Sequence, residues 1–147
     1  MRILILLSLV LGFSFSAQAL TLKEKQKLEY YKKQLTDPSG DNYLKTFKEK
    51  CGYDLPVTFD EKMITPFLAE NTSVSAYCDA PRSSLSGMCD DATAKDAIKG
   101  KIKKVSCKLG KKEEKAIKLV NGDLQFTVGL GAGNLDEFIR TWAENNL

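Results

Sequence analysis

Four cysteines follow a leader-like N-terminus, and the chain of 147 residues contains no histidine. An even number of cysteines in a small exported chain predicts disulfides, here among Cys51, Cys78, Cys89 and Cys107. The missing imidazole removes the commonest catalytic base and the commonest metal ligand of proteins. Such a chain has to fold around covalent cross-links and to work without histidine chemistry.

Residues 1–19 have the three parts of a cleavable signal peptide. Arg2 supplies a positive charge, residues 3–15 are mainly apolar, and Ala17-Gln18-Ala19 is a small-x-small cleavage site. We expect cleavage after Ala19 and release into the periplasm or the exterior, with an uncleaved N-terminal anchor as the alternative. The apolar run is too short to span a bilayer, and we expect no transmembrane segment in the rest of the sequence.

The remaining chain, residues 20–147, has the length of one domain. Removing Arg2 from the 22 basic residues leaves 21 against 19 acidic ones, which is a net charge of +2. This charge is too small to attract a polyanion by itself, so an anionic partner would have to meet a local patch of lysines.

The first half of this domain repeats its apolar residues at helical spacing. Thr21 and Glu24 form a capping-box pattern ahead of the first helix. Asp41 and Asp79 occupy cap positions ahead of later helices, and Pro66 predicts that the helix around it is short or kinked. The predicted helices span residues 22–35, 42–51, 60–70, 73–79, 81–89 and 91–99.

In the second half the apolar residues alternate, as they do in half-buried strands. The predicted strands span residues 102–109, 114–120 and 123–129. Asn121-Gly122 is a strong signal for a two-residue hairpin turn, and it sets a register in which Ile117 faces Phe126. A slip of one residue would move every apolar side chain to the opposite face, so the pattern specifies this register well.

A last amphipathic helix is predicted over residues 135–145, after the cap-like pattern of Asn134 and Glu137. A three-stranded sheet with a bare apolar face is not stable in water, so we expect this helix to cover it, with Trp142 against the sheet. The predicted fold class is α+β: a helical N-terminal half followed by a three-stranded antiparallel β-meander packed against a C-terminal helix. We expect a single disulfide-stabilised domain.

The pairing of the four cysteines is open, because four cysteines allow three connectivities. We prefer Cys51–Cys78 with Cys89–Cys107, since these bridges tie elements that are close in the sequence. Cys51–Cys107 with Cys78–Cys89 is the main alternative, because a helix break at Pro81 would let the second pair meet. The chain lacks the C-x-x-C spacing of redox and zinc sites, so we predict no metal and no other cofactor.

Carboxylate pairs are the candidates for catalysis: Asp60-Glu61, Asp90-Asp91 and Asp136-Glu137. Two carboxylates can support glycoside hydrolysis, but all three pairs stand at predicted helix starts, where acidic residues stabilise the helix dipole. The glycines at positions 129, 131 and 133 lack the spacing of a dinucleotide-binding turn. A small secreted hydrolase that uses carboxylates is therefore an alternative function, and we assign no catalytic residue.

Lysines gather on the predicted polar face of the sheet. Lys104, Lys108 and Lys118 project from that face, and its margins carry Lys101, Lys103, Lys111 and Lys112. These side chains can bind an anionic partner. Alternatively, they form a solvated face whose charge prevents pairing at the sheet edge. The face has no aromatic residue on which bases could stack, so we expect no nucleic-acid partner.

Together these features favour a small exported binding or interaction domain rather than an enzyme. Its expected partner is another protein or an anionic polymer of the cell envelope. A structural component of an envelope assembly is a further alternative, and it requires a large exposed apolar patch. The sequence leaves the oligomeric state open.

Overall fold

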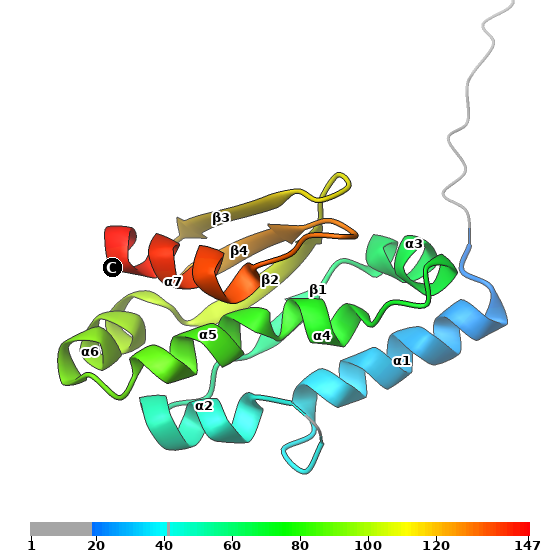
Figure 1. The fold of residues 1–147 in the computed structure, drawn as a ribbon. Helices are drawn as coiled ribbons and strands as arrows, with labels where there is room; N and C mark the ends of the chain where they lie inside the picture. The colour runs from blue at the N-terminus through cyan, green and yellow to red at the C-terminus, as the bar shows by residue number, and fades with distance from the viewer. Residues whose placement is uncertain (1–18, 41) are drawn as a thin grey trace, which may run out of the picture.

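The computed structural model describes residues 19–40 and 42–147, which form an α+β fold with a mixed sheet (Figure 1). The predicted leader up to residue 18 and the predicted cap Asp41 lie outside the described residues. The helices are α1 (Leu22–Thr36), α2 (Leu44–Cys51), the 3-10 turn η1 (Glu61–Met63), α3 (Ile64–Ala69), α4 (Val74–Cys78), α5 (Ala80–Met88), α6 (Ala92–Lys101) and α7 (Leu135–Asn146). The strands are β1 (Val57–Phe59), β2 (Lys104–Leu109), β3 (Lys115–Val120) and β4 (Asp123–Val128).

Local sequence signals place several helix starts. Thr21 and Glu24 form the predicted capping box of α1, in which the Thr21 N–H donates to the Glu24 carboxylate at 2.7 Å. Asp91 caps α6 through a main-chain N–H. Asp79 and Asn134 stand at the predicted N-cap positions of α5 and α7, but the predicted side-chain caps are absent. Neither side chain bonds a main-chain N–H of its helix, and Asn134 has a left-handed backbone conformation.

The predicted antiparallel meander is wrong, because the strand order is β1-β2-β4-β3. β2 pairs in parallel with both β1 and β4, and the hairpin of β3 and β4 is the antiparallel part of the sheet. Burial explains this order. The inner side chains of a central strand are fully shielded from water. β4 supplies Leu124, Phe126 and Val128 at these positions, and all three are fully buried. Ile117 and Leu119 of the edge strand β3 are only half-buried.

The hairpin itself has the predicted register, with Ile117 opposite Phe126 and Leu119 opposite Leu124. Asn121 and Gly122 both have positive φ angles, 50° and 81°. A type I′ turn requires this conformation, and Asn-Gly is the residue pair that adopts it most readily. The two-residue turn therefore sets the face on which each strand residue lies.

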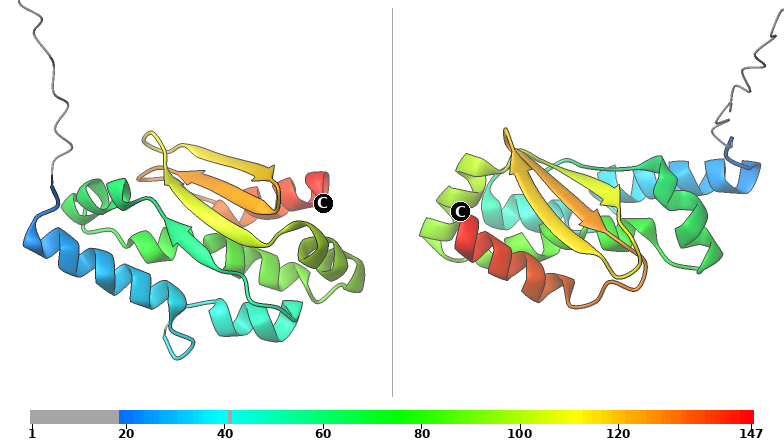
Figure 2. Two further views of the ribbon diagram at one scale, coloured as in Figure 1. Left: turned by 180° about the vertical axis from the view of Figure 1, so that it is seen from behind. Right: turned by 90° about the horizontal axis from the view of Figure 1, so that it is seen from above.

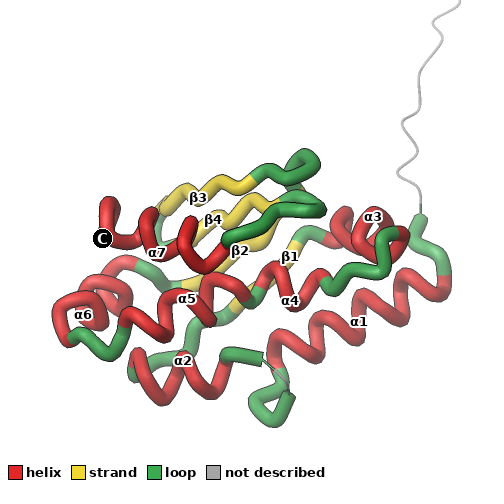
Figure 3. The backbone as a smooth tube through the Cα atoms, in the orientation of Figure 1, coloured by secondary structure: helices red, strands yellow, loops and turns green. Residues whose placement is uncertain are grey.

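Helices cover one face of the sheet and leave the other open. Figure 3 shows the helical layer, and the view from behind in Figure 2 shows no helix over the outer face of β2, β3 and β4. α7 lies between α5 and β3, where Ile139 and Ala143 are its buried residues. α7 contacts the sheet as predicted, and Trp142 is half-buried at the margin of the core, while Ile139 and Ala143 are the residues that lie deepest.

Both cysteine pairings considered from the sequence are wrong. Cys51 pairs with Cys89 and Cys78 pairs with Cys107, with Cα atoms 5.2 Å and 5.5 Å apart. Distance along the chain fails as a guide because α2 packs along α5, which brings the ends of these helices together. The first bridge joins helices and the second ties α4 to β2. Two disulfides fit an extracellular protein, because such bonds persist in oxidising compartments.

Opening the bridge between α4 and the sheet should destabilise the protein. We expect the double variant C78A/C107A to lose about 2–5 kcal/mol of unfolding free energy, measured by urea denaturation of the oxidised protein. C51A/C89A is the matched variant that keeps the bridge to the sheet. Peptide mapping without reduction should recover both observed pairs. Identical denaturation curves for oxidised and reduced protein would contradict this account.

Gly129 marks a close approach between two loops at the end of β4. A Cβ atom there would overlap the carbonyl oxygen of Lys111 and lie 2.6 Å from its carbonyl carbon. Both atoms belong to the main chain, so Gly129→Ala has to displace the β2–β3 loop and should cost more than about 2 kcal/mol. Gly133→Ala is the control, since nothing lies within 4 Å of its Cβ position. Equal melting temperatures for the two variants would refute the contact.

Candidate functional site

The open face of the sheet carries every second side chain of its strands. From the pairing register, the three longer strands place nine side chains there: Lys104, Ser106 and Lys108 of β2, Asp123, Gln125 and Thr127 of β4, and Ala116, Lys118 and Val120 of β3. The three lysines proposed from the sequence thus lie on one face, which we call the lysine face. Asp123 is the one carboxylate among these nine residues.

Two of the three ammonium groups flank a neutral amide. Lys108 donates to the Gln125 side-chain oxygen at 2.9 Å, and Lys118 stands directly opposite Gln125 on the neighbouring strand. The Lys118 side chain is exposed, and its ammonium makes no ion pair or hydrogen bond with any residue that the structure describes. The charges of Lys108 and Lys118 are therefore not neutralised by the protein itself.

Lys104 has a carboxylate neighbour that holds it loosely. Its ammonium lies 3.8 Å from the Asp123 carboxylate, which is longer than a charge-assisted hydrogen bond. The Asp123 side chain is 16% exposed, and its other oxygen is buried without a partner among the described residues. Lys104 remains 58% exposed, so it can turn toward an incoming anion.

The lysines at the margins are less available to a partner on this face. Lys101 donates to main-chain carbonyls at the end of α7, and Lys103 donates to the carbonyl of Lys99. Lys111 and Lys112 are exposed in the loop between β2 and β3, beyond the strands. The candidate site therefore narrows to the three lysines on the face.

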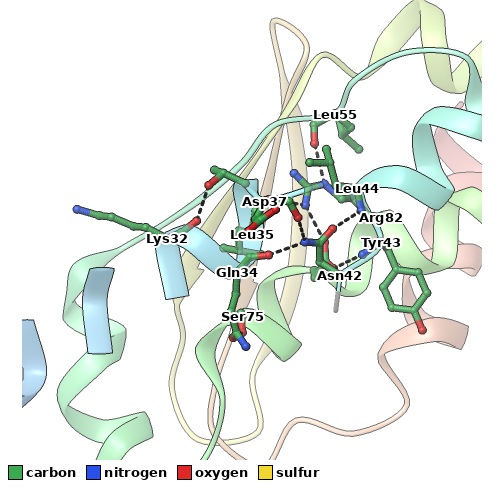
Figure 4. Close-up of polar contacts among 12 residues, drawn as sticks. Lys32, Gln34, Leu35, Asp37, Asn42, Tyr43, Leu44, Leu55, Ser75 and Arg82 are labelled. Carbon is green, nitrogen blue, oxygen red and sulfur yellow. Dashed lines mark hydrogen bonds and ion pairs between the residues drawn. The ribbon is translucent and has the colours of Figure 1, made fainter. Parts of the chain in front are cut away.

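A buried polar cluster, which the sequence analysis missed, lies on the helical side (Figure 4). Arg82 of α5 is 1% exposed. Its Nε donates to the Leu55 carbonyl at 2.8 Å, and its Nη1 donates to the Leu35 carbonyl at 2.9 Å and to the Asp79 carboxylate at 3.1 Å. The second Asp79 oxygen accepts from the Tyr43 N–H at 2.7 Å.

This cluster stabilises the fold and does not form a reactive or ligand-binding site. Burial lowers the pKa of the Arg82 guanidinium and the charge of Asp79 opposes that shift, while an arginine stays protonated in either case. Its donors are directed to main-chain carbonyls and to one carboxylate, not to a cavity. The signal that could have revealed it is the spacing of Asp79 and Arg82, three residues apart on the helix face that also carries Cys78 and Leu85.

The loop between α1 and α2 closes beside this cluster (Figure 4). The Asn42 amide donates to the carbonyls of Gln34 and Asp37, both at 2.7 Å, and its oxygen accepts from the Leu44 N–H at 2.8 Å. Asn42 therefore supports the start of α2, a role that the sequence pattern assigns to Asp41.

Removing the buried guanidinium should be costly. Arg82→Met leaves Asp79 and two carbonyls without their donor, and we expect a loss of about 3–5 kcal/mol in urea denaturation. The control is Arg140→Met, which breaks an exposed ion pair with Asp136 and should cost less than about 1 kcal/mol. If Arg82→Met unfolds at the same urea concentration as Arg140→Met, the cluster does not have the role assigned to it.

The carboxylate pairs stay at separate helix starts. Asp60 caps η1 and Asp91 caps α6. Exposed ion pairs hold three more of these acids: Glu61–Lys32, Asp90–Lys50 and Asp136–Arg140. Among residues 19–40 and 42–147, no three acidic or cysteine side chains gather closely enough to hold a metal ion. Caps and exposed ion pairs thus account for these five acids, and none of these contacts brings two carboxylates together.

A cavity of about 620 Å³ lies at the carboxyl ends of β2 and β4. Leu109 and Leu130 line it from the sheet side, and Tyr77 lines it from α4. The volume suits a small molecule, and ligands often bind at this edge of parallel strands. Its charged lining residues, Glu70 and Lys112, are both exposed, so the cavity has no buried charge to orient a ligand.

Comparison of the chain with protein-family models, curated proteins and solved structures finds no match. Within the described part of the chain, no helix is both long enough and apolar enough to cross a membrane. A function therefore has to be inferred from the lysine face, the buried cluster and the cavities themselves.

Proposed function

We propose that the protein is a small exported binding domain, not an enzyme, that holds an acidic protein against the lysine face of its sheet. The observation that supports this most is the grouping of Lys104, Lys108 and Lys118 on an uncovered face. Its one carboxylate, Asp123, forms an ion pair with Lys104 alone among the described residues, at 3.8 Å. The meeting place is the periplasm or the exterior, in keeping with the disulfides and the predicted leader.

The sheet holds these lysines at fixed separations. Lys104 and Lys108 are four residues apart on one strand, which is about 13 Å, and Lys118 lies two strands away from β2, which is about 10 Å. Ser106, Gln125 and Thr127 supply neutral hydrogen-bonding groups between them. Such an arrangement can match carboxylates on a folded partner, with charge complementarity setting the register and the association rate.

An acidic protein fits better than an anionic polymer. A polymer gains affinity from a continuous basic track, and here the lysines Lys101 and Lys103 at the margin are engaged with carbonyls. The overall charge of the chain is also close to zero, so long-range attraction of a polyanion is weak.

The alternative of a structural assembly component finds less support. The large apolar side chains that stand exposed in the described chain are Leu22, Tyr30 and Tyr43, at 74%, 50% and 46%. Two of these are on α1 and the third precedes α2, so they supply little of the several hundred Å² that an apolar assembly interface needs.

Reversing the charge of the lysine face should weaken partner binding. We expect K104E/K108E/K118E to capture the acidic partner from host envelope extract at least about tenfold more weakly than wild type, and high salt to weaken wild-type capture. K23E/K25E/K99E makes the same charge change at exposed lysines elsewhere and should bind like wild type. Equal capture by both triple variants would refute the proposal. Captured material that contains polysaccharide and no protein would assign the face to a polymer.

A further inference from the structure

β3 is an edge strand with an open side. It pairs with β4, and no other described strand lies along its outer side (Figures 1 and 2). Val120 and Asp123 close the hairpin turn, so the main-chain groups of Val120 and of every second residue before it point to β4. The N–H and C=O groups of Ile117 and Leu119 then point outward, where another strand can pair with them.

A groove of about 430 Å³ lies between β3 and α7, on the covered side of the sheet. It is lined by Lys115, by Asn134 at the N-cap of α7, and by one stripe of that helix: Glu137, Phe138, Thr141, Trp142 and Asn145. The lining from Asn134 to Asn145 is about 16 Å long, which matches about five residues of an extended strand. Phe138 and Trp142 are half-buried, so the groove has apolar walls that a partner side chain could cover.

A strand added to β3 would have two different faces, because side chains alternate along a strand. One set would point toward the groove beside Phe138 and Trp142. The other set would lie next to Lys118, whose ammonium has no partner among the described residues. The edge therefore favours a segment in which apolar and acidic residues alternate.

A second copy of this chain is a poor occupant of the edge. β3 carries Lys115 and Lys118 and no acidic residue, so two copies paired edge to edge would bring like charges together. An acidic strand instead places opposite charges side by side, which stabilises a cross-strand pair.

We propose that the open edge of β3 binds an extended segment of the partner protein, with alternating apolar and acidic residues, as an added strand. This inference rests on the proposed function, because it states how the acidic partner is held. In this mode the main chain of Ile117 and Leu119 pairs with the added strand, and Lys118 binds its acidic side chains. The groove beside α7 binds its apolar side chains.

Hydrogen exchange measured by NMR tests the geometry directly. In the free protein, the Ile117 and Leu119 amides should exchange faster than the Lys118 amide, which is bonded to β4. The probe is the synthetic peptide Glu-Val-Asp-Leu-Glu-Val-Asp, and a peptide of the same composition with its acids grouped is the control. The alternating peptide should slow exchange at Ile117 and Leu119 by about tenfold or more. Shift changes without this protection, or no binding at all, would overturn the proposal.

Proline substitution separates main-chain pairing from side-chain packing. Leu119→Pro removes an outward-facing N–H and leaves the ladder to β4 intact, which edge strands tolerate, whereas Leu119→Ala removes the side chain and keeps the N–H. We expect the proline variant to bind the alternating peptide at least about tenfold more weakly than the alanine variant. Equal affinity for the two variants would overturn edge pairing.

A charge swap keeps the test valid if the proline variant does not fold. Lys118→Glu should lose the acidic peptide and gain binding of Lys-Val-Lys-Leu-Lys-Val-Lys, and retention of the acidic peptide would overturn the proposal. Partner capture that fails in K104E/K108E/K118E and persists in Leu119→Pro would leave the proposed function standing and remove the edge mode. A wild-type dimer that Leu119→Pro dissociates would identify a second copy as the occupant and overturn the proposal.

Discussion

The buried pair of Asp79 and Arg82 is the contact on which the helical half depends. A guanidinium removed from water costs several kcal/mol unless a charge and hydrogen-bond acceptors replace the lost water. Here the acceptors are carbonyls at the end of α1 and just before β1, and Asp79 also holds the start of α2. None of these segments can shift alone without leaving a buried polar group unpaired, so the pair specifies one arrangement of α1, α2, α5 and β1.

A disulfide connects this arrangement of helices to the sheet. Cys78 precedes Asp79 in the chain, and its bond to Cys107 fixes the junction of α4 and α5 to the middle of β2. Helices then cover the inner face of the sheet, and the outer face is exposed to solvent. The backbone under this outer face is rigid, because β2 and β4 each have hydrogen-bonded strands on both sides. A face held in this way keeps Lys104, Lys108 and Lys118 at constant spacing, which recognition of a folded partner requires.

The sequence correctly predicted the features that depend on residues close together in the chain. The capping box of α1 and the Asn121-Gly122 turn are set by neighbouring residues, and the alternation of β2 with the hairpin register placed the lysines on one face. Contacts between segments far apart in the chain could not be predicted from the sequence. The parallel pairing of β2 with β4 depends on which strand buries more apolar surface, and the cysteine partners depend on how α2 packs along α5. Arg82 was missed because a charged residue is usually exposed, and its partners come from distant segments.

The proposed binding mode depends on the observed strand order. In the predicted meander, β3 would lie between β2 and β4, its main-chain groups would all be paired, and Lys118 would stand in the middle of the sheet. Because β2 pairs with β4 instead, β3 becomes the edge and exposes the main chain at Ile117 and Leu119. An open edge carries a risk of aggregation. Lys118, whose ammonium has no partner among the described residues, reduces that risk toward neutral strands and identical copies, while it leaves the edge open to a strand that brings its own carboxylates.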